Sequence, residues 1–387
     1  MAIIHQIFSK FALIGDDLRL KQNVLIDINK QGRILNINYN SSKDENEVKF
    51  SFPHHLLLPK FINSHTHLGD TVLKDQAFGL SLNEAVGIGG RKYQANKHER
   101  IHRITAMRSA IIEMIESGTS ACYDFREGGL NGIIELQEAA NDLPIDLHIL
   151  GRQNTKIDLD DVLSQCDGLG LPTPLFFSPH ELNMIQQQTS SRNTLVATHV
   201  GEEPQVIQES LNQFGLSDLQ VALKYLNPNI LIHLTAYDEN DLIKIPSSKF
   251  IVFCPRSNAY FGLGFPPISY FLNKKNLIGL GTDNVMTIAP NILEELRWLV
   301  LRLKEQGISI DPVQALKLIT INPSKALKMK TGCIKEEFWA DLLIINLQSC
   351  RTAYGKDPIM SLLFRCLLPE DISLNLFHGE IVSNELF

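Results

Sequence analysis

Two histidines separated by one residue, His65 and His67, follow an apolar run that covers residues 56–62. On a strand, residues i and i+2 point to the same face, so both imidazole rings are expected to converge on one point. Polar side chains also follow later apolar runs, namely His199, Glu202, His233 and Asp283. Buried polar groups at the ends of several strands make sense together if they surround a shared ligand, most simply a metal ion. The pattern indicates a metalloenzyme.

The elements that must position these residues alternate along the chain from about residue 57 to 330. Eight apolar strands separated by amphipathic helices predict an α/β fold, a (β/α)8 barrel of TIM type. In such barrels catalytic groups gather at the C-terminal ends of the strands, which is where the histidines and Asp283 fall. The predicted strands are 57–64, 119–124, 145–150, 167–171, 194–198, 229–232, 249–253 and 277–281, with helices at 99–117, 131–140, 203–213, 238–244, 267–273 and 290–305.

Residues 68–98, directly after the first predicted strand, are too polar and too rich in glycine for a regular element. A long irregular segment at this place is typical of an active-site lid or a substrate-binding loop.

Both ends of the chain have strand character. Residues 23–29 alternate between polar and apolar types, residues 33–38 follow a turn, and residues 341–345 and 379–382 are strand-like. We expect the two ends to pair into one small β-sandwich domain, although two separate caps would give the same pattern. The predicted domains are residues 1–56 and 331–387 for the β-sandwich and residues 57–330 for the barrel.

Composition excludes some classes of function. The chain has 387 residues, 20% charged residues and a net charge of −7, so nothing suggests a general surface for nucleic acid or anionic lipid. Its six cysteines are scattered, which is typical of reduced thiols. The start lacks the pattern of a signal peptide, and no apolar run reaches the roughly 20 residues that span a bilayer. We expect a cytoplasmic protein without a membrane or nucleic-acid partner.

The order of the motifs resembles the amidohydrolase superfamily. Within it, the chain is similar to the deaminase-type branch of cytosine, guanine and S-adenosylhomocysteine deaminases and triazine hydrolases. The motifs are His-x-His at 65–67, His-x-x-Glu at 199–202, His233, Asp283 after Gly-Thr, and the run at 254–258. The resemblance covers nearly the whole chain, but Lys60 stands where members commonly have glycine.

The resemblance implies that His65, His67, His199 and Asp283 bind one divalent metal ion and leave room for a water molecule. Imidazoles and a carboxylate suit zinc best, while iron and manganese remain alternatives. The ion would lower the pKa of its water toward about 7 and so generate hydroxide. Two-metal relatives usually bridge their ions with a carbamylated lysine at the end of the fourth strand, and this region has none. A bridge through Glu181 is the remaining two-metal alternative.

Three residues are predicted to act in catalysis. Glu202, just beyond His199, is the candidate general acid and base, although a glutamate there can also favour a helix start, a role that suits Glu203 better. His233 is expected to donate a hydrogen bond to the attacking hydroxide, or else to serve as a metal ligand. The resemblance implies that Asp283 also shuttles a proton.

Candidate substrate-binding residues follow other strands and loops. Arg126 and Arg152 could hold an anionic or carbonyl group of the substrate, but Arg126 could equally pair with Asp124 or Glu127. The further candidates are Arg256, Lys74 and His180, the last of which could instead begin a helix.

The leading hypothesis is a metal-dependent hydrolase that deaminates an amino-substituted N-heterocycle by means of a metal-bound hydroxide. The same site could hydrolyse an amide, an imine or a carbon–halogen bond. A non-catalytic barrel that binds a metal or a ligand is the alternative of another class, but such a protein has no use for a general base. The expected partner is a small-molecule substrate, and a homodimer is expected by analogy.

Overall fold

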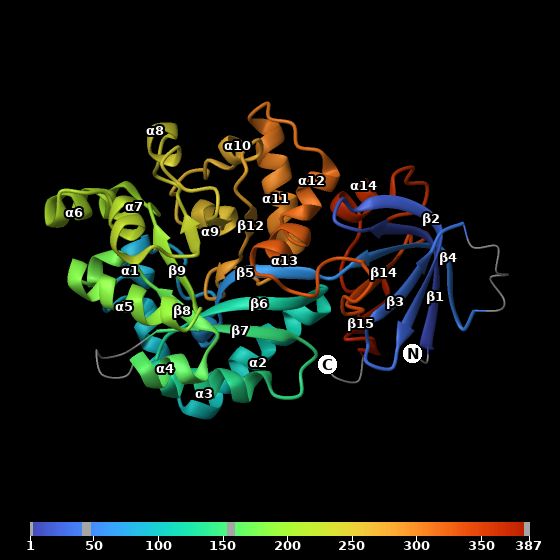
Figure 1. Ribbon diagram of the computed structural model, residues 1–387, viewed down its shortest axis with the longest axis horizontal. Coiled ribbons are helices and arrows are strands. Elements are labelled where there is room, and N and C mark those ends of the chain that lie inside the picture. Colours follow the sequence, from blue (N-terminus) through green and yellow to red (C-terminus); the bar gives the residue numbers. More distant parts are fainter. Residues whose placement is uncertain (1–2, 41–47, 153–158, 383–387) are drawn as a thin grey trace.

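A computed structural model describes residues 3–40, 48–152 and 159–382. The chain forms a barrel of parallel strands with surrounding helices, and a separate sheet built from both ends lies beside it (Figure 1). This arrangement confirms the predicted fold of a TIM-type barrel with a terminal β domain. The exact residues at which the two domains divide stay a prediction.

From β5 to β12 each strand pairs in parallel with the next in chain order, and β13 pairs in parallel with β5. Seven of the eight predicted strands begin within about two residues of their expected positions. The first begins at Phe61 rather than at 57, because residues up to Pro59 pair with the terminal sheet. The strands are β5 (Phe61–His67), β6 (Thr119–Arg126), β7 (Asp146–Gly151), β8 (Gly168–Leu171), β9 (Leu195–Val200), β10 (Ile230–His233), β11 (Phe250–Phe253), β12 (Ile278–Leu280) and β13 (Asp283–Asn284).

The barrel closes where its last strand is interrupted. Between β12 and β13, Gly281 lies against β5 so closely that an added Cβ would be 2.5 Å from the Cβ of His65, which requires a residue without a side chain. The amide of Asn63 bonds both the hydroxyl and the backbone nitrogen of Thr282, at 2.8 and 3.2 Å. Asp283 then pairs in register with Thr66 of β5. The closure thus sets the first and last strands side by side at the end that carries the polar residues.

Helices cover the outside of the barrel and bury apolar faces against it. All six predicted helical stretches match observed helices to within two residues at each end, and α8 and α10 are each three residues shorter than predicted. Among the described residues, no helix combines the length and apolar character needed to cross a bilayer. The helices are α2 (Arg100–Glu116), α3 (Gly129–Ala140), α4 (Leu159–Gln165), α5 (Pro179–Ser191), α6 (Pro204–Phe214), α7 (Asp218–Val221), α8 (Glu239–Leu242), α9 (Pro255–Tyr260), α10 (Ile268–Phe271), α11 (Ile292–Glu305), α12 (Pro312–Lys317), α13 (Ile321–Ala326) and α14 (Pro358–Phe364).

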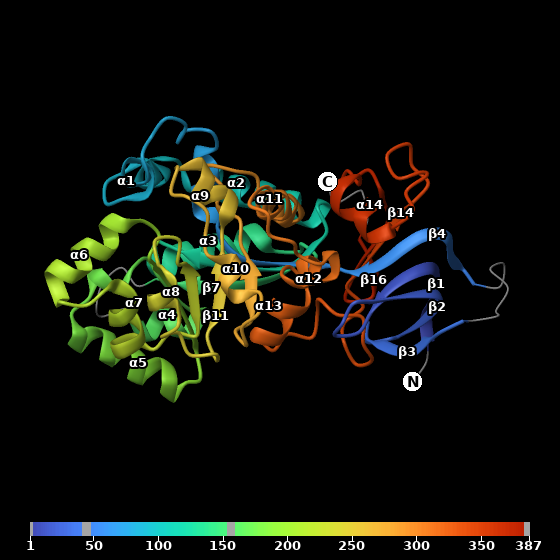
Figure 2. The ribbon, with the colours of Figure 1, turned by 90° about the horizontal axis from the view of Figure 1, so that it is seen from above.

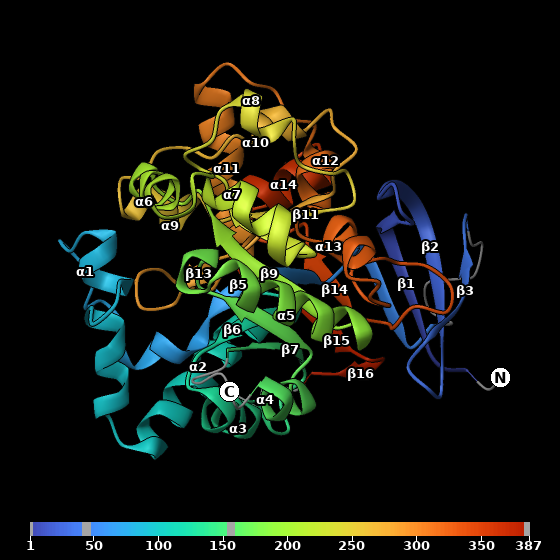
Figure 3. The ribbon, with the colours of Figure 1, turned by 60° about the vertical axis from the view of Figure 1, so that its left-hand side comes forward.

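The segment 68–98 forms three short helical pieces rather than one regular element, as its composition predicts. They are η2 (Leu68–Leu73), α1 (Leu82–Val86) and η3 (Arg91–Lys97). A capping box at Ser81 and Glu84 begins α1. Figures 2 and 3 show α1 at the end of the barrel opposite the terminal sheet, on the same side of the molecule as α6. We call residues 68–98 the β5–α2 excursion.

Strands from both ends of the chain pair in one sheet, as expected. Its order is β16-β15-β14-β4-β1-β2-β3, and Leu342 of β14 pairs with Pro59 of β4. The sheet packs around an aliphatic core of its own, in which Ile26, Leu57 and Ile344 are fully buried. The strands are β1 (Ile3–Ile14), β2 (Arg19–Asn29), β3 (Ile34–Asn38), β4 (Phe50–Pro59), β14 (Leu342–Asn346), β15 (Ile372–Phe377) and β16 (Glu380–Ile381).

Lys60, between β4 and β5, is fully buried where the sheet meets the barrel. Its ammonium group has no hydrogen-bond partner among the described residues. Burial lowers the pKa of Lys60 from 10.5 to about 8, although the charges of Asp341 and Asp146 oppose the shift. A lysine whose pKa falls on folding destabilises the native state at every pH below the folded value, on the order of 3 kcal/mol for a shift of this size.

Lys60→Met is therefore expected to raise the free energy of unfolding by about 1–3 kcal/mol at pH 7, because it removes a buried charge but keeps a chain of similar length. The gain should shrink as the pH rises from about 8 toward 10.5, where the wild-type lysine loses its proton in both states. Chemical denaturation at pH 7 and pH 10 measures both values. Lys74→Met, at an exposed lysine, is the control and should give no comparable gain. A loss of stability in Lys60→Met at pH 7 would contradict this account.

Candidate active site

Four buried side chains meet at the C-terminal end of the barrel: His65, His67, His199 and Asp283. One nitrogen or oxygen atom from each lies within 4.8 Å of the others. The Nε2 atoms of His67 and His199 are 3.3 Å apart. Oδ1 of Asp283 lies 3.3 Å from Nε2 of His65 and 3.5 Å from Nε2 of His67. The four residues predicted as metal ligands are therefore brought together in space.

The donor set fits a divalent metal ion. Nδ1 of His199 lies 3.0 Å from the carbonyl oxygen of Leu171, so it is expected to carry the proton and to leave Nε2 as a free lone pair. Both ring nitrogens of His65 are buried without a hydrogen-bond partner. Ligands about 2.0–2.1 Å from a tetrahedral zinc ion are roughly 3.3–3.4 Å apart, as several of these atoms are. Converging lone pairs at such distances fit a cation held between them.

Burial gives these groups the protonation states that a metal needs. It lowers the pKa of His65 to about 3 and that of His199 well below its usual value, so both imidazoles are neutral. Burial acts to raise the pKa of Asp283, but the close contact with Nε2 of His65 and the charges of the neighbouring imidazoles keep it well below its usual value. Ser257 also donates a hydrogen bond to Oδ2 of Asp283 at 2.6 Å.

Two site residues have strained backbones. His233 has a φ of +76° and Asp283 a φ of +64°, in the region that L-residues rarely adopt. Such strain persists only where the surroundings enforce it, and it is common at functional sites. At Asp283 the enforcing contacts include the pairing with β5.

Glu202 and His233 form a second group beside the four ligands. Oε1 of Glu202 lies 3.6 Å from Nε2 of His233, and both residues approach Asp283. Burial raises the pKa of Glu202 to about 7, while the charge of His233 opposes the shift. Nδ1 of His233 lies 3.2 Å from the amide oxygen of Asn258, which leaves Nε2 to face the site. A carboxylate with a pKa near neutrality can both accept and donate a proton.

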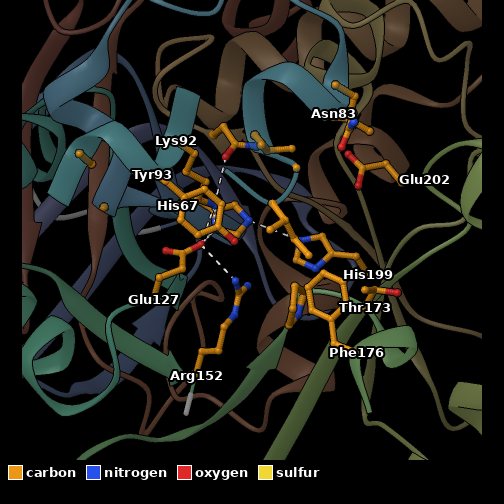
Figure 4. Close-up of a pocket in the computed structure, with 18 of the residues that line it drawn as sticks. His67, Asn83, Lys92, Tyr93, Glu127, Arg152, Thr173, Phe176, His199 and Glu202 are labelled. Atoms are coloured by element: carbon orange, nitrogen blue, oxygen red, sulfur yellow. Dashed lines mark hydrogen bonds and ion pairs between the residues drawn. The ribbon is translucent and has the colours of Figure 1, made fainter. Parts of the chain in front are cut away.

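A cavity of about 870 Å³ opens above these groups. Its lining includes the candidate ligands His67, His199 and Asp283 together with Glu202, and side chains from the excursion and from α6 (Figure 4). Tyr93 and Phe176 add aromatic surface. The volume lies within the usual range for small-molecule sites of about 300–1,000 Å³.

The model of the amidohydrolase family matches residues 56–366 of this chain. The chain belongs to the amidohydrolase family. The matched residues include every barrel strand and all four residues of the candidate metal-ligand group.

Several relatives of this amidohydrolase are similar over most of their length. An uncharacterized protein of Methanocaldococcus jannaschii is 29% identical over 95% of this chain and 97% of its own. A putative aminohydrolase of Methanothermobacter thermautotrophicus is 30% identical over 80% of this chain and 82% of its own. The 5-methylthioadenosine/S-adenosylhomocysteine deaminase of Pyrococcus abyssi is 27% identical over 96% of this chain and 91% of its own.

Solved structures share the fold at lower identity. An atrazine chlorohydrolase of Arthrobacter aurescens with bound zinc superposes with a TM-score of 0.85, 18% identity and coverage of 99% of this chain and 96% of that one. A guanine deaminase of C. acetobutylicum with bound guanine gives a TM-score of 0.80 at 14% identity, covering 98% of this chain and 100% of that one.

The predicted substrate-binding residues of this amidohydrolase divide into two groups. Arg126 and Arg152 line the cavity. Nε of Arg126 donates to the Gly132 carbonyl at 2.9 Å, and its guanidinium lies 3.8 Å from Glu135 rather than pairing with Asp124 or Glu127. The other three candidates are not among the cavity-lining residues. Lys74 pairs with Glu113, and Arg256 lies near Glu295. His180 lies in the first turn of α5.

Two charged residues of the site were not predicted from the sequence. Lys92 of η3 and Glu127 just after β6 both lie beside His67, at 3.1 Å from its Nδ1 atom. Glu127 follows a predicted strand, so its position at a strand end was a usable signal. Lys92 carries no such signal, because the path of the excursion cannot be read from its composition.

Proposed function

We propose that this amidohydrolase is a metal-dependent hydrolase that deaminates an amino-substituted N-heterocycle. The observation that carries the proposal is the pair Glu202 and His233, which lies beside Asp283, with Glu202 and Asp283 both lining the cavity. A protein that only binds a metal has no need of a general acid and base beside it. The deaminase and aminohydrolase names of the relatives support the same reaction class.

The ion would be held by His65, His67, His199 and Asp283. When bound there, a divalent cation, with zinc preferred and iron or manganese as alternatives, lowers the pKa of a water ligand and so supplies hydroxide near neutral pH. The zinc in the similar chlorohydrolase structure supports this choice.

The remaining residues transfer protons and orient the attacking water. Glu202 accepts a proton from the attacking water and passes it to the departing nitrogen, so that oxygen replaces the amino group on the ring carbon and ammonia leaves. His233 presents Nε2 to the attacking oxygen and, with a proton on that nitrogen as well as on Nδ1, stabilises the tetrahedral centre by donating a hydrogen bond. Asp283 assists the proton transfer while it serves as a ligand.

The cavity is larger than a bare heterocycle needs, which favours a substrate with a substituent on its ring. Arg126 and Arg152 stand on the wall formed by the ends of β6 and β7, where they would hold an anionic or carbonyl group of that substituent. The names of the Pyrococcus relatives favour an aminopurine with a substituent, and of the two compounds named only S-adenosylhomocysteine has a carboxylate that these arginines could hold.

Hydrolysis of a carbon–halogen bond is the second candidate, and the fold shared with a chlorohydrolase favours it. The same residues could activate water for either leaving group.

Release of ammonia from a panel of heterocycles tests the proposal. The panel should contain aminated purines, pyrimidines and pterins, 5-methylthioadenosine and S-adenosylhomocysteine, each with its chloro analogue where one exists. We expect metal-dependent release of ammonia from at least one amino compound. Release of chloride alone would favour the second candidate, and no turnover by the metal-loaded protein on any compound would count against both.

A further inference from the structure

Glu127 lies between three nitrogen atoms from three different segments (Figure 4). Its Oε1 atom is 2.6 Å from Nζ of Lys92, 3.1 Å from Nδ1 of His67 and 3.7 Å from the guanidinium of Arg152. His67 ends β5, Glu127 follows β6, Arg152 follows β7 and Lys92 lies on η3 of the excursion. One carboxylate oxygen therefore joins a candidate metal ligand, two strand ends and the excursion.

The arrangement fixes the role of each group toward His67. Nε2 of His67 faces the other ligands, so a cation there requires the proton of the neutral ring on Nδ1. A protonated Nδ1 needs an acceptor, which Glu127 is and the ammonium of Lys92 is not. The 3.1 Å separation between Lys92 and Nδ1 is thus the distance between two donors that share one oxygen.

The ammonium group of Lys92 contacts acceptors of the protein itself. Besides Glu127, its Nζ atom reaches the amide oxygen of Asn284 at 3.4 Å. The side chain is only 15% exposed, whereas Ile88, four residues earlier on the excursion, is 78% exposed. Lys92 therefore anchors the excursion at the metal-ligand group from within the cavity.

We propose that Glu127 and Lys92 are a positioning pair that couples the metal centre to the excursion. Glu127 fixes the ring of His67 so that Nε2 points to the cation. Lys92 neutralises Glu127 and holds η3 over the cavity. Loss of either member loosens the excursion, and loss of Glu127 also weakens metal binding. The proposal rests on the proposed metal site but holds for any reaction catalysed there.

The first test measures zinc affinity by competition with a chromogenic chelator. Glu127→Gln keeps an acceptor without charge and should weaken zinc binding about tenfold, while Glu127→Ala removes the acceptor and should weaken it up to about 100-fold. Glu135→Gln is the matched control, because Glu135 also lines the cavity and pairs with arginines but contacts no candidate ligand. Circular dichroism verifies folding of each variant. If both Glu127 variants hold zinc as tightly as the wild type, the proposal is wrong.

The second test follows amide hydrogen exchange of residues 91–97. Lys92→Met and Glu127→Gln should each speed exchange there severalfold, and the double variant should exchange no faster than the faster single one, because both remove the same ion pair. Lys74→Met, which breaks an exposed ion pair of the same excursion, should leave these amides unchanged. Unchanged exchange in Lys92→Met, or multiplied effects in the double variant, would overturn the coupling. A wild-type protein that binds no zinc would instead refute the proposed metal site, whatever the exchange result.

Discussion

Glu202→Gln is expected to lower turnover on the order of 10²–10⁴-fold on a substrate found in the ammonia assay, because general acid–base catalysis has about this weight. The amide keeps the shape of the side chain and its place beside Nε2 of His233, but it cannot act as the base. Metal content should not change, since Glu202 is not among the four converging ligands. Steady-state kinetics and elemental analysis of the same preparation measure both quantities.

Glu203→Gln is the matched control for this variant. Glu203 is the next residue, lines the same cavity and stands at the N-cap position of α6 without a capping hydrogen bond, and it is not grouped with His233 and Asp283. Its turnover should stay close to that of the wild type. If Glu202→Gln lost the metal, Glu202 would be a ligand and another residue would have to carry the proton. Full activity in both variants would refute the mechanism.

The pH dependence of kcat/KM gives a further check on Glu202. Burial raises the pKa of its carboxyl to about 7 in the protein without a bound ion. A divalent cation nearby favours the ionised form and so lowers this pKa. A base must be deprotonated to act, so activity should fall with decreasing pH, and the midpoint of that fall should lie at or below about pH 7.

The barrel and the candidate ligand group could be predicted because their sequence patterns are local and recur along the chain. Continuous apolar runs mark buried parallel strands, and the histidines stand directly after them. Once the fold is a barrel, strand ends must converge, so separate motifs become one site without any knowledge of side-chain geometry.

Residues on irregular segments could not be placed in the same way. Arg256 and Lys74 were predicted to bind substrate because of their charge, but neither lines the cavity, and each lies beside a glutamate, Glu295 or Glu113. Lys92 lies on the β5–α2 excursion, and the path of this segment depends on tertiary contacts such as the ion pair between Lys92 and Glu127. The sequence therefore did not place Lys92 in the site. Charge and spacing alone do not distinguish a cation that faces a cavity from one that is already paired.

Removal of the metal is expected to abolish hydrolysis and to leave the barrel folded. The carboxylate of Asp283 accepts hydrogen bonds from Ser257 and Asn284 at 2.6 and 2.9 Å, so it keeps hydrogen-bond partners when no ion is bound. The apolar core between barrel and helices contains no ligand residue. Dialysis against a chelator should therefore reduce activity to background while circular dichroism stays unchanged and the melting temperature falls, because a ligand of the native state has been lost. Re-addition of zinc should restore activity.

Elemental analysis of the active protein should find close to one equivalent of zinc, iron or manganese in total. Four donors converge on one point. The alternative bridging residue, Glu181, closes a capping box with Ser178 at the start of α5 and is not part of the candidate ligand group. Two equivalents that survive dialysis, with density for a second ion, would overturn the single-metal assignment. One equivalent that is lost in His199→Ala but kept in Glu202→Gln would distinguish the ligand from the base, because only the histidine has its nitrogen among the converging atoms.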